Sequence, residues 1–121
     1  MIPQLNPRDF AAWRDSARAS GVAAALPVLL DVREPWEVQT ASVTPDGFTL
    51  VHIPVREIPA RLESLRQAHG ADHPIACICH HGMRSLQAAN YLAQSGFGEV
   101  INVQGGIDAW SEQLDPSVAR Y

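Results

Sequence analysis

Apolar residues along the chain gather in four short runs. These largely apolar runs occupy residues 27–32, 49–53, 75–78 and 100–103. Runs of this length, with little polar alternation, are typical of parallel strands that are covered on both faces. The pattern therefore predicts four buried strands, and Pro54 ends the second of them.

The segments between these runs carry helical spacing instead. Ile58, Leu62 and Leu65 recur on one face of a predicted helix, and Gly70 ends it. Similar patterns predict a helix that opens at Arg84 or Ser85 and ends at Gly96, and a last helix from Ile107 to about Gln113. Asn6 and Pro7 form a favourable start for an N-terminal helix over residues 6–20.

Strands that alternate with helices imply parallel pairing with right-handed crossovers. The expected fold class is therefore α/β, with a parallel sheet of about four to five strands flanked by helices. The 121 residues correspond to one domain, 1–121, with a core of about 28–113. The tail, 115–121, has no periodicity, and we expect it to lie along the surface.

Composition narrows the function classes. The hydrophobic content of 46% is sufficient for a core, and the net charge of −4 gives no basic surface for nucleic acid. The sequence contains no run of about 18 apolar residues, so it predicts no membrane span. Its first residues do not resemble a secretory signal. We therefore expect a cytoplasmic protein. All nine basic residues are arginines, so any cation at a site must be Arg or His.

Chemistry is concentrated in one segment, Cys79 to Ser85, which follows the third apolar run. The order of strand, cysteine, short turn with Gly82 and helix points the thiol toward a helix N-terminus. Loop amides and the helix dipole can stabilise a thiolate there. In parallel sheets, ligands bind beyond the carboxyl ends of the strands, which is where Cys79 lies.

The chain has one other cysteine, Cys77, separated from Cys79 by a single residue. Two such close thiols form neither a disulfide framework nor a zinc site, so no metal and no cofactor are expected. We interpret Cys77 as a small core residue. The alternative is a second redox thiol.

The spacing within the loop indicates which group it binds. Four residues separate Cys79 from Arg84, whereas a cysteine phosphatase loop has five intervening residues that wrap a tetrahedral phosphate. A loop one residue shorter makes a smaller ring of amides, which suits one added sulfur atom better than a phosphoryl group. A small phosphatase or arsenate reductase is therefore the weaker interpretation.

Three segments resemble the rhodanese family of sulfurtransferases, in family order. Cys79 to Ser85 resembles its active-site loop, residues 30–37 its N-terminal signature and residues 103–110 its C-terminal signature. His52-Ile53-Pro54 resembles a further strand end of the family. One departure is the stretch 40–43, Thr-Ala-Ser-Val, where the family usually has Gly-His-Ile.

The resemblance implies a thiosulfate sulfurtransferase-like enzyme with Cys79 as the catalytic nucleophile. Its thiolate would take a sulfur atom from a small anionic donor such as thiosulfate, and the persulfide would pass that sulfur to cyanide, a thiol or a sulfur-accepting protein. The alternative is a sulfur-carrier or regulatory binding module without useful turnover that uses the same loop. No nucleic-acid or membrane partner is implied.

The remaining site residues have expected roles of binding or support. His80, His81, Gly82, Met83 and Arg84 are candidates for substrate binding. Asp31 and Arg33 are expected to stabilise the loop, and Ser85 is expected to cap the helix. Trp36 and Trp110 are expected in the core, and Gly105 and Gly106 in a tight turn with positive φ.

Overall fold

The computed structural model describes residues 2–20 and 26–121, and its centre is a five-stranded parallel sheet. The strand order is β1-β5-β4-β2-β3. The strands are β1 (Gln4–Leu5), β2 (Val28–Asp31), β3 (Thr49–His52), β4 (Ile75–Ile78) and β5 (Val100–Val103). The predicted α/β class, and the prediction of four to five parallel strands, are therefore confirmed.

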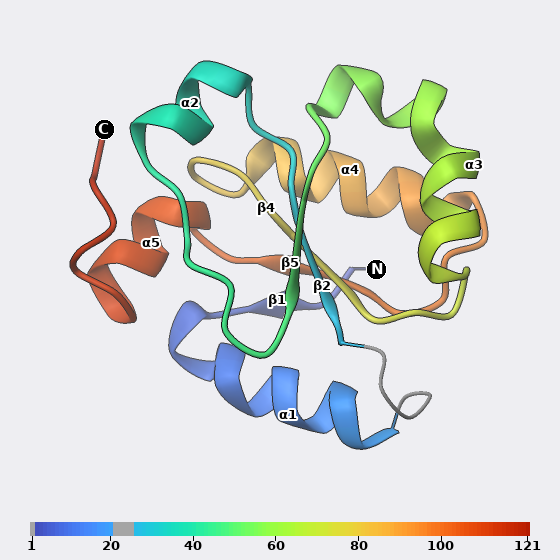
Figure 1. The fold of residues 1–121 in the computed structure, drawn as a ribbon, viewed down its shortest axis with the longest axis horizontal. Coiled ribbons are helices and arrows are strands. Elements are labelled where there is room, and N and C mark those ends of the chain that lie inside the picture. Colours follow the sequence, from blue (N-terminus) through green and yellow to red (C-terminus); the bar gives the residue numbers. More distant parts are fainter. Residues whose placement is uncertain (1, 21–25) are drawn as a thin grey trace.

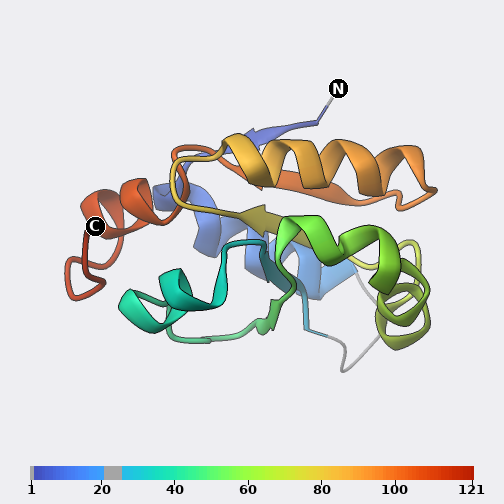
Figure 2. The same ribbon diagram turned by 90° about the horizontal axis from the view of Figure 1, so that it is seen from above.

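Helices cover both faces of this sheet (Figures 1 and 2). Helices α3 and α4 lie on one face and α1 and α5 on the other, whereas α2 lies beyond the end of β2. The helical segments are α1 (Phe10–Ser20), α2 (Pro35–Thr40), α3 (Ile58–His69), α4 (Met83–Gln94) and α5 (Gly106–Gln113), with 3-10 turns η1 (Pro7–Asp9) and η2 (Val55–Glu57).

Two hydrophobic clusters fill the space between the sheet and its helices. Successive side chains of a strand point to opposite faces, so Leu30 and Cys77 join the cluster beneath α3 and α4. Leu29 and Ala76 join the cluster that contains Phe10 and residues of α5. Cys77 is fully buried, which confirms its interpretation as a core residue.

Aromatic rings concentrate in the second cluster. The Phe10 ring lies 4.8 Å from that of Trp110 and 5.3 Å from that of Phe48, both in edge-to-face arrangements. Trp110 is 4% exposed, as expected of a core residue. These contacts fix α1 and α5 on the same face of the sheet.

The N-terminus differs from the sequence prediction in two respects. Gln4–Leu5 forms strand β1, which pairs with Asn102 and Val103 of β5. Helix α1 begins only at Phe10, after the 3-10 turn, and the Asn6 side chain makes no capping hydrogen bond. The short strand was not predicted, because a strand of two residues is too short to show a periodicity.

The C-terminal tail packs more closely than expected. Val118 is buried, and its carbonyl oxygen accepts a hydrogen bond from Ser111 Oγ at 2.6 Å. The tail then ends at the edge of the molecule that carries α2 (Figures 1 and 2). Within residues 2–20 and 26–121, no helix combines the length and apolar character that crossing a bilayer requires.

Candidate active site

Cys79 follows β4 directly and is 1% exposed. Its Sγ accepts a hydrogen bond from the backbone N–H of Gly82 at 3.1 Å and one from Ser85 Oγ at 3.3 Å. Gly82 occupies the N-cap position of α4 with a φ of 101°, a left-handed conformation that favours glycine. The sulfur therefore lies at the N-terminus of α4 and accepts hydrogen bonds from two donors.

Ser85 does not act as the predicted helix cap. Gly82 holds the N-cap position, and Ser85 lies inside the first turn of α4 with no exposed surface. Its hydroxyl is directed at Cys79 Sγ instead. The expectation that Ser85 caps the helix was therefore wrong, because the helix starts at Met83, earlier than the sequence pattern indicated.

The turn between β5 and α5 forms hydrogen bonds with the cysteine loop. The carbonyl oxygen of Cys79 accepts a hydrogen bond from Ile107 N at 2.7 Å, and that of His80 accepts one from Asp108 N at 3.2 Å. A Cβ atom at Gly106 would lie 2.4 Å from both carbonyl oxygens. Gly105 and Gly106 have φ values of 80° and 63°, which confirms the predicted turn.

A buried amide anchors the same loop from the sheet. The side chain of Asn102, on β5, donates from Nδ2 to the carbonyl oxygen of Gly82 at 3.1 Å and to Gln4 Oε1 at 2.9 Å. Asn102 Oδ1 is buried and has no hydrogen-bond partner among the residues that the structure describes. The residue that donates to Cys79 Sγ is thus itself tied to strand β5.

Arg84 binds Glu37, a residue that the sequence did not single out as part of the site. Arg84 Nη1 and Nη2 donate to Glu37 Oε1 and Oε2 at 2.6 and 2.9 Å. The Glu37 side chain is 4% exposed and that of Arg84 is 35% exposed. The hydrogen bond from Arg84 outweighs the effect of burial and lowers the pKa of Glu37 to about 2.

Asp31 and Arg33 form a buried pair beside the loop. Arg33 has no exposed surface, and its Nη2 lies 2.6 Å from Asp31 Oδ2. Arg33 Nη1 donates to the backbone oxygen of Glu37 at 3.2 Å. The guanidinium therefore connects the end of β2 with helix α2. Support of the cysteine loop by Asp31 and Arg33 stays a prediction.

Tyr121 connects the tail to this cluster, and sequence reasoning did not identify it. Its hydroxyl donates to Glu37 Oε2 at 2.8 Å and accepts from Arg33 Nη1 at 3.0 Å. Its ring stacks on that of His80 with centroids 3.9 Å apart and an interplanar angle of 8°. Burial is the main reason why the pKa of Tyr121 is raised to about 12.

The two loop histidines stack on each other, with ring centroids 3.9 Å apart. His80 is half-buried, and its Nε2 has no hydrogen-bond partner within residues 2–20 and 26–121, whereas His81 is exposed. Burial, followed by the neighbouring His81, lowers the pKa of His80. A lowered pKa favours the neutral imidazole near pH 7.

Two large apolar side chains are exposed at this end of the molecule. Met83, the first residue of α4, is 74% exposed, and Trp36, on α2, is 61% exposed. The Trp36 ring lies 6.1 Å from that of Tyr121 in an edge-to-face arrangement. The prediction that Trp36 is a core residue was wrong, because the short helix α2 lies beyond the end of β2 rather than over the sheet.

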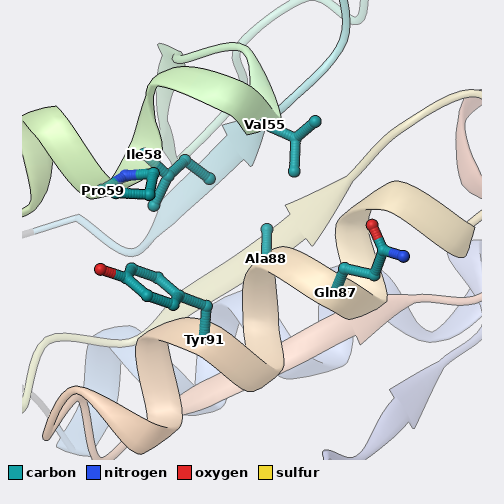
Figure 3. Close-up of a pocket in the computed structure, with 6 residues that line it drawn as sticks. All are labelled: Val55, Ile58, Pro59, Gln87, Ala88 and Tyr91. Atoms are coloured by element: carbon teal, nitrogen blue, oxygen red, sulfur yellow. The ribbon is translucent and has the colours of Figure 1, made fainter.

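The structure also shows where an apolar groove lies and whether side chains gather that could hold a metal ion. An apolar groove of about 180 Å³ lies between η2, α3 and α4, where Val55, Pro59 and Tyr91 are among its lining residues (Figure 3). The lining includes no residue of the Cys79–Ser85 loop. Within the part of the chain that the structure describes, no group of three or more His, Cys, Asp or Glu side chains could hold a metal ion.

The fold and the loop define a parallel α/β domain that carries a single buried cysteine at a helix N-terminus. Residues 11–113 match the rhodanese-like domain family. The chain therefore belongs to the rhodanese-like family, as the sequence resemblance indicated.

The chain is similar to proteins named as sulfurtransferases and to part of a longer rhodanese-like protein. The chain is 37% identical over 92 residues to a sulfurtransferase of Allochromatium vinosum and covers 78% of it. It is 33% identical over 95 residues to the thiosulfate sulfurtransferase GlpE of Pseudoalteromonas translucida and covers 81% of it. It is 37% identical over 93 residues to the rhodanese-like/PpiC domain-containing protein 12 of Arabidopsis thaliana. These matches span 76%, 77% and 77% of this chain, respectively, but only 30% of the Arabidopsis protein.

A solved structure supports the same fold. The crystal structure of a rhodanese-related protein from Thermoplasma volcanium matches with a TM-score of 0.73 at 29% identity. The match covers 99% of this chain and 100% of that one. The five-stranded parallel sheet and its flanking helices are therefore those of a rhodanese-like domain.

Proposed function

We propose that the chain is a sulfurtransferase in which Cys79 carries the transferred sulfur as a persulfide. The observation that supports this most directly is the environment of Cys79 Sγ, which accepts hydrogen bonds from Gly82 N–H and Ser85 Oγ at the N-terminus of α4. The thiolate is the nucleophilic form of a cysteine. The names of the Allochromatium and Pseudoalteromonas relatives add support for this reaction class.

The proposed cycle has two displacement steps. The Cys79 thiolate attacks the outer sulfur of thiosulfate, a bond forms between the two sulfur atoms, and the S–S bond of the donor breaks as sulfite leaves with its electron pair. Cyanide or an acceptor thiolate then attacks the outer sulfur of the persulfide. Cys79 leaves as a thiolate, so each cycle restores the enzyme without an external oxidant or reductant.

The other loop residues have proposed roles around this sulfur. The Gly82 N–H group and the Ser85 hydroxyl stabilise the thiolate, which is both attacking and leaving group. Arg84, held on Glu37 and still 35% exposed, presents its remaining N–H groups to the anionic donor. His80, His81 and Met83 complete the donor site.

One observation favours a sulfur-carrier function as the second candidate. Trp36 and Met83 are large, exposed and apolar at the end of the domain that holds the loop. Such side chains are enriched at protein interfaces. In a carrier, the outer sulfur of the same Cys79 persulfide would pass to a partner protein, and turnover with cyanide would be negligible.

Intact mass measurement distinguishes these functions. After incubation with thiosulfate and removal of the excess, the wild type should gain the mass of one sulfur atom, and cyanide should remove it. Cys79→Ser should gain nothing. Loading without release to cyanide would favour the carrier, and the absence of loading on the wild type would contradict both. The wild type should not hydrolyse aryl phosphates. If it does, and Cys79→Ser does not, the protein would instead be a phosphatase.

A further inference from the structure

The C-terminal tail contributes one side chain to the network that holds Arg84. Tyr121 lies 84 positions from Glu37 in the sequence, yet its hydroxyl donates to Glu37 Oε2 at 2.8 Å. The same carboxylate oxygen accepts Arg84 Nη2 at 2.9 Å. A phenol and a guanidinium therefore share one oxygen of a buried carboxylate.

Each oxygen of the Glu37 carboxylate accepts two hydrogen bonds. Its Oε1 accepts from Arg84 Nη1 at 2.6 Å and from the backbone N–H of Glu34 at 3.0 Å. Its Oε2 accepts from Arg84 and from Tyr121. With four donors around it, the carboxylate has one orientation, and the bidentate geometry passes that orientation on to the Arg84 guanidinium.

The position of the Tyr121 hydroxyl is itself fixed from two sides. Arg33 Nη1 donates to its oxygen at 3.0 Å, so the phenol proton is directed toward Glu37. The ring lies flat against His80 with centroids 3.9 Å apart. The tail thus contacts the cysteine loop through an aromatic ring and the arginine network through a hydroxyl.

We propose that Tyr121 is a positioning residue that orients Arg84, through Glu37, for recognition of an anionic sulfur donor. This inference rests on the proposed function, in which Arg84 binds that donor. The hydroxyl acts on the guanidinium through Glu37, whereas Cys79 Sγ receives its hydrogen bonds from Gly82 and Ser85. Removing the hydroxyl should therefore weaken anion recognition and leave the reactivity of the thiol intact.

Tyr121→Phe separates these effects because it keeps the ring on His80 and removes only the hydroxyl. We expect the KM for thiosulfate to rise about three- to tenfold, the effect of losing one hydrogen bond, with kcat within about twofold of the wild type. Tyr91→Phe is the matched control, since the second tyrosine of the chain lies in the apolar groove (Figure 3). Its KM should be unchanged.

Alkylation of Cys79 tests the inference without sulfur transfer. Iodoacetate and iodoacetamide carry the same reactive carbon, but only iodoacetate is anionic. In Tyr121→Phe, the ratio of the iodoacetate rate to the iodoacetamide rate should fall about threefold or more, while the iodoacetamide rate stays within about twofold of the wild type. Tyr91→Phe should retain the wild-type ratio.

The outcomes separate this inference from the proposed function. An unchanged rate ratio in Tyr121→Phe, or an equal loss with both reagents, would overturn the role of Tyr121 in anion recognition. A wild type that never gains a sulfur atom from thiosulfate would instead contradict the proposed function. A reduced ratio in that case would still support Tyr121 as the residue that orients Arg84.

Discussion

The guanidinium of Arg84 and the carboxylate of Glu37 form a bidentate ion pair between residues 47 positions apart in the sequence. Arg84 is the second residue of α4, the helix that follows the cysteine loop, and Glu37 lies on α2, so the pair ties the start of α4 to the segment that follows β2. The pair gives Arg84 a structural role in addition to the donor-binding role that we propose for it.

Replacing Arg84 by alanine should therefore impair both activity and stability. We expect the catalytic efficiency with thiosulfate to fall about ten- to a hundredfold, as when a charge-assisted hydrogen bond is lost. The free energy of unfolding should fall by about 1–3 kcal/mol, since the buried Glu37 carboxylate loses its partner while Arg84 itself is one-third exposed. Enzyme kinetics and denaturant unfolding measure the two effects.

Arg61→Ala is a suitable control for this variant. Arg61 is 49% exposed and lies 3.8 Å from Glu57 in a helical i,i+4 pair. Its removal should change the free energy of unfolding by less than about 0.5 kcal/mol. If Arg84→Ala and Arg61→Ala have the same free energy of unfolding, the ion pair between Arg84 and Glu37 does not stabilise the fold.

Glu37 should make the stability of the protein depend on acidity. Its pKa is about 2 in the folded protein and near 4.5 in the unfolded chain. The folded form binds the proton less readily, so this contribution is fully present above about pH 5 and is lost as the pH falls toward 2. In Glu37→Gln, the free energy of unfolding should be lower at pH 7 and should fall less steeply between pH 5 and 3.

Denaturant titrations of the wild type and Glu37→Gln at several pH values would measure this dependence. The difference between the two proteins should be largest near neutral pH and should shrink in acid. Parallel curves with a constant offset would show that the carboxylate charge does not carry the effect.

Gly106→Ala should damage the cysteine loop itself. Its Cβ would lie 2.4 Å from the carbonyl oxygens of Cys79 and His80, in addition to the strain of a φ of 63°. We expect a lower melting temperature and loss of most persulfide formation, because the loop must move to admit the methyl group. Thermal unfolding and intact mass after thiosulfate are the measurements.

Gly96→Ala separates the clash from backbone strain. Gly96 also has a positive φ, 99°, but a Cβ there meets no atom within 4 Å. This variant should lose only about 1 kcal/mol of stability and keep full persulfide loading. If the two alanine variants behave alike, the contact between Gly106 and the loop is unimportant.

Cys77 should be inert in the folded protein. Burial, followed by the charge of the neighbouring Cys79, raises its pKa to about 12. Iodoacetamide at neutral pH should therefore label Cys79 and leave Cys77 unmodified until the protein unfolds. Cys77→Ala should retain persulfide loading and lose about 1–2 kcal/mol of stability. Recovery of the persulfide mainly on Cys77 would overturn the assignment of Cys79.

The sheet and the cysteine loop could be predicted from the sequence because their signals are local. The apolar runs around Leu29, Ile75 and Val100 each contain a strand, and Gly82 marks the turn before α4. The strand β1 is an exception, since Gln4 and Leu5 acquire their conformation only by pairing with Asn102 and Val103 of β5.

The contacts around the loop could not be predicted in the same way, because they join distant segments. Nothing in the pattern around Tyr121 indicates a partner 84 positions away, and no spacing links Glu37 with Arg84. Trp36 was wrongly predicted to be buried, because a large aromatic side chain is more often found in the core. Only the position of α2 in space explains its exposure.

The position of β4 in the sheet determines how the site responds to partial unfolding. This strand lies in the middle of the order β1-β5-β4-β2-β3, paired on both sides, whereas β1 and β3 form the edges. Amide hydrogens of Ile75–Ile78 should therefore exchange with solvent only through global opening, while those of the edges exchange through local fraying. Cys79 directly follows this central strand, so local fraying at either edge of the sheet should leave the position of the cysteine unchanged.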